Sequence, residues 1–374
     1  MLFKTAPRFW EKTSLTKEPF RALFDRLISV ILLPLSWIYG LLVWLKQMVV
    51  DSGIMQTLGI YRPAPVPLII VGNIRVGGTG KTPLVIALAN ALFEEGFRPG
   101  VISRGYQPNG QSPLQAPQEV IQTSDPNMVG DEPVLMAQRL HYQIPVLVFK
   151  KRAQCIDALL RAHAEVNVII SDDGLQHAAL VRWPAREGGR DLELVVEDER
   201  GIGNGRLLPA GPLRESAVRE RDATISIGAD KPIDEPLAKS KLFQFAPQID
   251  RAYPLHRPNE SQSFTELLTK LMGLKIAAIA AIGNPQKFFD ALTRLGVHLN
   301  HSLSLPDHAP IQSGDIAQID ADYIFITEKD AVKCIAIDDP RIWVVPLHLP
   351  LSTEFLGWVR TIIERPNPYI ASTR

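Results

Sequence analysis

A glycine-rich stretch between an apolar run and a helical pattern constrains this chain more than any other feature. The stretch reads Val71-Gly-Asn-Ile-Arg-Val-Gly-Gly-Thr-Gly-Lys-Thr-Pro83. Residues 67–71 have the apolar character of a buried strand, and residues 84–93 have the apolar spacing of a helix packed on a sheet. A strand, a glycine-rich turn and a helix in this order are typical of a phosphate-binding loop. We therefore expect an α/β protein that binds a nucleoside triphosphate.

The residues of this loop have separate expected roles. Phosphate contacts are expected from the helix N-terminus and from the backbone N–H groups of Gly77, Gly78, Thr79, Gly80, Lys81 and Thr82. The Lys81 side chain would add a point charge, and the Thr82 hydroxyl a magnesium ligand. Arg75 stands where the common Gly-x-x-x-x-Gly-Lys-Ser/Thr pattern has its first glycine. Val76 stands where the membrane-cycling and partitioning ATPases carry an additional lysine, which counts against that class.

Length and composition set the outer limits of the prediction. A chain of 374 residues, 46% of them hydrophobic, can form two α/β domains with their own cores. The formal net charge is zero, so no global field suggests a nucleic-acid partner. The two cysteines, Cys155 and Cys334, lack the spacing of metal ligands, which fits a reducing cytosol without disulfides or structural zinc.

Residues 27–45 form an uncharged, apolar run that is just long enough to span a bilayer. Trp37, Tyr39 and Trp44 favour a membrane interface, although a buried core helix has the same composition. The preceding flank is the more basic one, with Lys or Arg at 4, 8, 12, 17, 21 and 26. The positive-inside rule would then place the nucleotide site outside the cell if the run crossed the membrane. We therefore expect a helix, bent at Pro34, that lies in the inner leaflet without crossing it.

Alternating apolar and helical patterns predict a doubly wound parallel sheet. The expected strands of the first domain are 67–72, 99–103, 145–149, 166–171, 193–196 and 223–227, and those of the second are 275–282, 323–327 and 342–347. The pattern is lost after Gly228. The predicted organisation is an N-terminal membrane-associated region at 1–60, a P-loop core at 61–228, a linker at 229–263 and a smaller α/β domain at 264–374.

Acidic residues follow two of these elements. Asp172 and Asp173 end an apolar strand, where a P-loop fold places the carboxylate that holds magnesium directly or through water, although the pair could also cap the next turn. Gly130-Asp-Glu-Pro133 precedes a helical pattern. Asp131 or Glu132 could be a helix cap, or could accept the proton of a substrate hydroxyl. Arg104 after a strand and the long Gly/Pro loop 201–215 are further candidates for ligand contacts.

Several longer motifs occur in a fixed order: Ser103-Arg-Gly-Tyr, Gly130-Asp-Glu-Pro, Asp172-Asp-Gly-Leu-Gln-His, Gly203-Asn-Gly-Arg-Leu-Leu-Pro-Ala-Gly-Pro-Leu-Arg-Glu, Pro306-Asp-His and Thr327-Glu-Lys-Asp-Ala-Val-Lys. With the phosphate-binding loop, they resemble the tetraacyldisaccharide 4'-kinase family over nearly the whole chain. The resemblance implies transfer of the ATP γ-phosphate to the 4'-hydroxyl of a lipid A disaccharide 1-phosphate precursor, giving lipid IVA. Two local differences are Leu175, where the family usually has Phe, and a short insertion at 183–190.

The resemblance also implies roles for individual residues. Asp131 would take the hydroxyl proton, and His308 would join it from the second domain when the cleft closes. ATP and Mg²⁺ are the implied cofactors, with Lys81, Thr82 and Arg214 on the nucleotide and Thr82, Asp172, Asp173 and Glu215 around the metal. The implied partners are the lipid precursor and the cytoplasmic face of the inner membrane, with no nucleic acid and no obligatory protein partner. The alternatives are a membrane-associated regulatory P-loop ATPase and a cytosolic P-loop kinase for a small molecule.

Overall fold

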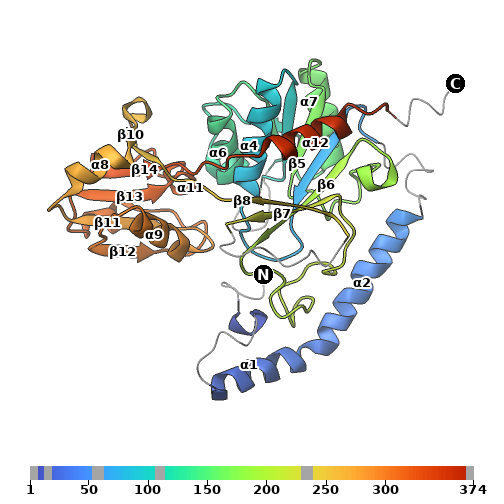
Figure 1. Ribbon diagram of the computed structural model, residues 1–374, viewed down its shortest axis with the longest axis horizontal. Helices are drawn as coiled ribbons and strands as arrows, with labels where there is room; N and C mark the ends of the chain where they lie inside the picture. Colours follow the sequence, from blue (N-terminus) through green and yellow to red (C-terminus); the bar gives the residue numbers. More distant parts are fainter. Residues whose placement is uncertain (1–6, 12–18, 53–62, 106–113, 229–238, 368–374) are drawn as a thin grey trace. The chain divides into compact units, whose positions relative to one another are not determined.

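The computed structural model describes residues 7–11, 19–52, 63–105, 114–228 and 239–367 of the chain (Figure 1). The chain divides into two compact units. We call residues 1–104, 151–246 and 351–374 the P-loop unit, and residues 105–150 and 247–350 the second unit. Each unit is discontinuous in sequence, because the chain leaves the P-loop unit twice and returns to it twice.

A parallel sheet forms the centre of the P-loop unit. Its strands lie in the order β2 (Pro99–Ser103), β5 (Val168–Asp172), β1 (Leu68–Gly72), β6 (Leu192–Asp198), β7 (Ala223–Ile227) and β8 (Lys241–Phe245). Every residue of β1, β2, β5 and β7 is buried, which explains their nearly continuous apolar sequences. This arrangement confirms the predicted α/β fold with a parallel sheet.

Three helices pack on this sheet. The helix α4 (Lys81–Glu94) contacts β1, β2 and β5, and α7 (Arg152–Ala162) contacts β2. The helix α12 (Thr353–Ile363) returns from the end of the chain, and its Phe355 packs edge-on against Phe243 and Phe245 of β8. The carboxyl ends of β1 and β5 therefore lie near the N-terminus of α4, and this is where a phosphate could bind.

The N-terminal part of the P-loop unit is helical. A short 3-10 helix, η1 (Arg8–Trp10), is followed by α1 (Pro19–Ile31) and α2 (Leu33–Asp51), and the break between them falls just before Pro34 in the first turn of α2. Among the described residues, α2 alone is long and apolar enough to cross a membrane, with a mean hydropathy of 1.4 over Leu33–Val50 and 6% of that window buried. The predicted bend at Pro34 is thus present, whereas positions 4, 12 and 17 of the basic flank lie outside the described residues.

The second unit contains a mixed sheet and a short antiparallel pair of strands. The sheet order is β10 (Gln262–Ser263), β9 (Arg251–Pro254), β14 (Ile342–Val345), β13 (Tyr323–Thr327), β11 (Ile276–Ala280) and β12 (His301–Ser304). The last four strands are parallel to one another, and β9 is antiparallel to its neighbours. The antiparallel pair consists of β3 (Gln118–Glu119) and β4 (Val146–Val148).

Both faces of the mixed sheet are covered. Alternate residues of β11 enter two separate apolar clusters, Ala278 with Phe288 and Phe325 in one and Ala277 with Ile316 in the other. The described helices of the second unit are α5 (Pro126–Val129), α6 (Asp131–Arg139), α8 (Phe264–Leu271), α9 (Pro285–Arg294), α10 (Ser313–Ala317) and α11 (Glu328–Ala331). The 3-10 turn η4 (Pro258–Glu260) also belongs to this unit, whereas η3 (Ala185–Glu187) belongs to the P-loop unit.

The two units divide the chain differently from the predicted domain boundaries. Residues 105–150, predicted within the P-loop core, belong to the second unit, and residues 351–374 belong to the P-loop unit. The predicted linker 229–263 contains β8, β9 and β10, while its residues 229–238 lie outside the described residues. These strands are short, and β8 has only a half-buried alternation of Lys, Leu, Phe, Gln and Phe, so the sequence pattern was too weak to mark them.

Candidate active site

The phosphate-binding loop connects β1 directly to α4. Gly77 and Gly80 have φ angles of 111° and 87°, in the region that glycine adopts without steric cost. The amide of Asn73, which is fully buried, donates to the Gly77 carbonyl at 3.2 Å and to the Thr79 hydroxyl at 3.1 Å. The loop is therefore braced from within, and the first N–H groups of α4, which no helical carbonyl can satisfy, mark this end as suited to an anion.

Three predicted residues meet at the start of α4. The Lys81 ammonium lies 3.3 Å from one carboxylate oxygen of Asp173, and the Arg214 guanidinium lies 3.2 Å from the other. Burial acts to raise the pKa of Asp173, but the charges of Lys81 and Arg214 outweigh it and hold that pKa well below its usual range. Asp173 is thus a carboxylate at neutral pH, between the two cations predicted to bind nucleotide.

The two neighbouring acids have different surroundings. Asp172, the last residue of β5, accepts a hydrogen bond from the Ser103 hydroxyl at 3.1 Å, and its backbone carbonyl accepts one from Arg152 at 2.6 Å. Asp173 has a φ of 50°, a left-handed conformation that is uncommon for a residue with a side chain. The chain therefore turns between the two acids, which directs Asp172 toward the end of β2 and Asp173 toward Lys81.

The predicted metal neighbour Glu215 lies in an ion pair. Its carboxylate is 2.5 Å from Arg219, which also pairs with the buried Glu193 at 2.9 Å. The preceding residue, Arg214, donates its backbone N–H to the carbonyl of Ile74 at 2.7 Å, so loop 201–215 is joined to the start of the phosphate-binding loop. Arg104, the other arginine that the pattern singled out, is exposed.

The N-terminal helices are fastened to the same loop. Ser29, Ser36, Tyr39 and Lys46 follow one another at intervals of seven, three and seven residues, which places them along one helical face. Their side chains donate to backbone carbonyls: Ser29 to Ala210 at 2.6 Å, Ser36 to Leu207 at 2.8 Å, Tyr39 to Arg214 at 2.9 Å and Lys46 to Gln176 at 2.7 Å. The remaining faces carry exposed apolar side chains such as Trp37 and Trp44.

In the second unit, Asp131 and His308 form a direct pair. The His308 Nδ1 lies 2.8 Å from the Asp131 carboxylate, whose side chain is 8% exposed. Burial acts to raise the pKa of Asp131, but the hydrogen bond from His308 and the charges of Lys329, His308 and Lys333 lower it overall. His308 itself has a φ of 64°, a strained conformation of the kind found at functional sites.

The contacts of Asp131 bear on two expectations, its pairing with His308 and its alternative role as a helix cap. The expected pairing of Asp131 with His308 is present, and both residues belong to the second unit. That closure of a cleft brings them together stays a prediction. The expected alternative of a helix cap does not hold, because Gly130 is the N-cap of α6 and no side chain caps it. Asp131 instead occupies the first helical position, with its carboxylate shared between His308 and the Glu132 N–H at 2.9 Å.

Sequence reasoning missed the lysines beside this pair. The Thr327–Lys333 motif places Lys329 3.3 Å from His308 Nε2 and Lys333 3.8 Å from Asp131. Their spacing of four residues, on one side of a helical turn, was the available signal.

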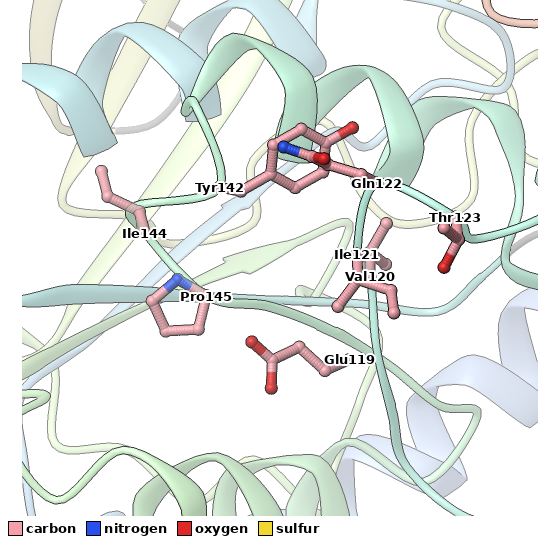
Figure 2. A pocket seen from close by; sticks show the side chains of 8 residues that line it. All are labelled: Glu119, Val120, Ile121, Gln122, Thr123, Tyr142, Ile144 and Pro145. Carbon is pink, nitrogen blue, oxygen red and sulfur yellow. The ribbon is translucent and has the colours of Figure 1, made fainter.

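A pocket of about 350 Å³ lies elsewhere in the second unit (Figure 2). Its lining consists of Glu119, Val120, Ile121, Gln122, Thr123, Tyr142, Ile144 and Pro145. None of these residues belongs to the predicted site. Within the described residues, no group of three or more His, Cys, Asp or Glu side chains is arranged to hold a metal.

The fold and the loop define a P-loop nucleotide-binding protein with a second α/β unit. Residues 28–364 match the family model described as tetraacyldisaccharide-1-P 4'-kinase. The tetraacyldisaccharide 4'-kinase of Polynucleobacter necessarius is 50% identical over 374 residues, covering 98% of both chains. That of Polynucleobacter asymbioticus is 48% identical with the same coverage, and that of Bordetella bronchiseptica is 40% identical over 91% of this chain and 94% of its own.

A solved structure shows the same fold. The "apo" form of LpxK from Aquifex aeolicus in complex with ATP superimposes with a TM-score of 0.71 and 24% identity, over 90% of this chain and 99% of that chain. The chain therefore belongs to the tetraacyldisaccharide-1-P 4'-kinase family. This result confirms the family and the enzyme class that the motif order predicted.

Proposed function

We propose that this chain transfers the γ-phosphate of ATP to the 4'-hydroxyl of tetraacyldisaccharide 1-phosphate, forming lipid IVA in lipid A biosynthesis. The family membership supports the reaction, and one observation carries the residue assignment. A buried carboxylate, Asp131, is hydrogen-bonded to His308 at 2.8 Å and kept ionised by nearby cations. Such a carboxylate can accept a hydroxyl proton, which is the acid-base role that phosphoryl transfer requires.

The nucleotide side of the reaction falls to the P-loop unit. The phosphates would be bound by the backbone N–H groups of residues 77–82 and by the Lys81 and Arg214 side chains. Both side chains now pair with Asp173, and they would be released to the phosphates if the Asp173 carboxylate bound a metal ion instead. Phosphoryl transfer depends mainly on positioning and on neutralising charge, so these groups supply most of the catalysis. The His308-paired Asp131 would then receive the proton as the new oxygen–phosphorus bond forms.

The residues also fit Mg²⁺. The Thr82 hydroxyl and the carboxylates of Asp172 and Asp173 are oxygen ligands, which magnesium prefers, and it commonly takes only one or two carboxylates and completes its shell with phosphates and water. A bound Mg²⁺ would neutralise charge on the phosphate oxygens. Asp173, which faces Lys81, is the better placed of the two acids for direct contact, and Glu215 would first have to leave Arg219.

The substrate's acyl chains call for work at a membrane surface, and we place the protein on the cytoplasmic face of the inner membrane. One face of α1 and α2 is held against the rest of the P-loop unit by hydrogen bonds that four side chains donate to backbone carbonyls: Ser29, Ser36, Tyr39 and Lys46. A helix held to the unit at four points along its length favours a position at the membrane surface over one that crosses the bilayer. Its exposed apolar faces suit insertion into one leaflet, which supports the interfacial helix over a spanning one.

The function is tested with purified protein, labelled ATP, Mg²⁺ and the disaccharide lipid acceptor. We expect label in the lipid, and a loss of about a hundredfold or more in Asp131→Asn and in Lys81→Ala. Asp290→Asn, an exposed carboxylate on α9, is the control and should retain full activity. Absence of label with folded protein would overturn the proposed reaction. Full activity of Asp131→Asn would remove Asp131 as the proton acceptor.

A further inference from the structure

The Thr327–Lys333 segment has no part in the proposed reaction, yet it surrounds the Asp131–His308 pair with positive charge. The segment turns from β13 into α11, and the Thr327 hydroxyl accepts a hydrogen bond from the Asp330 N–H at 3.2 Å and donates to the Asp330 carboxylate at 2.7 Å. This cap fixes the start of α11. It therefore fixes where the Lys329 and Lys333 side chains leave the backbone.

Lys329 is largely enclosed by acceptors. Its ammonium lies 2.9 Å from the Glu132 carboxylate, 3.3 Å from His308 Nε2 and 3.5 Å from the Asp307 carboxylate, with 17% of the side chain exposed. Burial acts against the charge, but Glu132, Asp131 and Asp307 outweigh it and raise the pKa of Lys329. Lys329 is thus an ammonium group at neutral pH.

An ammonium group has three donors and no acceptor. The 3.3 Å contact with Lys329 therefore requires a lone pair on His308 Nε2. The proton of a neutral imidazole must then be on Nδ1, the nitrogen that lies 2.8 Å from Asp131. The two contacts select one tautomer, in which His308 donates to Asp131 and accepts from Lys329.

We propose that Lys329 is a positioning residue that holds His308 as the neutral tautomer with its proton on Nδ1, so that Asp131 remains the acceptor of the substrate proton. This inference rests on the proposed function. In the step concerned, the hydroxyl O–H bond breaks, its proton passes to the Asp131 carboxylate, and the oxygen forms a bond to the γ-phosphorus. The bond between that phosphorus and the leaving oxygen breaks, and ADP departs with its electron pair.

The other charged groups around the pair act on it in known directions. Asp307 lies 3.7 Å from His308 Nε2 and favours a second proton on the ring, but Lys329 is nearer and opposes it. Lys333 lies 3.8 Å from Asp131 and 3.6 Å from Asp330, and it donates to the Ala309 carbonyl at 3.1 Å, so it steadies the His308 loop. Glu132 holds Lys329 from the opposite side.

The first test is independent of turnover. The full chain is labelled with ¹⁵N-histidine, and the signals of His308 are assigned among the eight histidines by their loss in His308→Gln. We expect a neutral ring protonated on Nδ1 at pH 7 in the wild-type protein. In Lys329→Met, which removes the donor, the preference for Nδ1 should weaken, so that part of the neutral rings carries the proton on Nε2. A wild-type ring protonated on Nε2, alone or together with Nδ1, would overturn the inference.

The second test uses activity. We expect Lys329→Met to lower kcat about tenfold to a hundredfold, the usual range for one lost hydrogen bond to a charged group, with the KM for ATP unchanged. The acid side of its pH–rate profile should move to higher pH, and Lys329→Arg should recover most of the activity. Lys275→Met, an exposed lysine of the same unit, is the control. An equal loss at every pH would show a merely structural role and overturn the inference. If the wild type labels no lipid, the proposed function fails, while the tautomer measurement still decides the role of Lys329.

Discussion

Glu193 is a buried charge of the P-loop unit that pairs with three arginines. It lies on β6 with 3% of its side chain exposed, and its carboxylate pairs with Arg182 at 2.5 Å, Arg186 at 2.8 Å and Arg219 at 2.9 Å. Arg219 also holds Glu215 in the loop that reaches the phosphate-binding loop. Replacing Glu193 with Gln keeps the shape of the side chain but leaves three guanidinium groups without their shared negative charge.

The expected loss of unfolding free energy follows from the pKa of Glu193. Burial acts to raise the pKa of Glu193, but Arg182, Arg219 and Arg186 lower it from 4.5 to about 2. A shift of this size corresponds to about 3 kcal/mol, close to the ~3–5 kcal/mol typical for breaking a buried ion pair. Because the folded-state pKa is depressed, the stabilisation is fully present above pH ~4.5 and is lost as the pH falls toward 2.

The assay is urea unfolding of wild type and Glu193→Gln at pH 7, 5, 4 and 3. We expect the variant to lose about 3 kcal/mol of unfolding free energy at pH 7. The difference in unfolding free energy between wild type and variant should become smaller below pH ~4.5. Glu187→Gln, whose carboxylate is 56% exposed and 3.6 Å from Arg186, is the control and should change stability by less than about 1 kcal/mol. A loss below about 1 kcal/mol at pH 7, or one that does not narrow with falling pH, would refute the reasoning.

Two further predictions concern packing and the membrane. A Cβ at Gly72 would lie 2.6 Å from Leu175 Cγ and 3.1 Å from Leu175 Cβ, so Gly72→Ala should cost about 1–3 kcal/mol in urea unfolding. The cost should be smaller in a Leu175→Ala background, which removes Cγ but keeps Cβ, and equal costs in both backgrounds would show that the two residues do not meet. Trp37 and Trp44 are 69% and 57% exposed on α2, so replacing both with Ser should weaken binding to anionic vesicles about a hundredfold or more in flotation. The control is Val218→Ser, an exposed apolar residue outside α2, and unchanged flotation of the tryptophan variant would argue against insertion of α2.

The sequence was most informative where one periodicity extended over a whole element. The strands β1, β2, β5 and β7 are buried on both faces, so their apolar runs marked them plainly, and α4 followed from its spacing. Asp173 and Lys81 could be predicted as neighbours because parallel strands end at one edge of a sheet. The contact of Arg214 with Asp173 came only from the family resemblance, since its loop has no regular pattern.

In the second unit, the features that the sequence pattern could not predict depend on contacts between residues far apart in the chain. Nothing in residues 105–150 indicates that they leave the P-loop unit, because membership of a compact unit depends on contacts between segments far apart in sequence. The same limit applies to Lys329, whose role depends on Glu132, nearly two hundred positions earlier in the chain. Short strands such as β9 and β10 were missed because two to four residues carry no periodicity.

The placement of Asp131 changes how the proposed reaction would be controlled. Asp131, His308 and Lys329 all belong to one unit, so the proton acceptor, its histidine and the lysine that orients the histidine are assembled together. Formation of this group therefore does not depend on where the P-loop unit lies. Lys81, Asp173 and Arg214 form an equally self-contained group in the other unit. In the proposed reaction, contacts within one unit would set the rate of proton transfer and contacts within the other would neutralise the phosphate charge, so substitutions in the two groups should change different kinetic quantities.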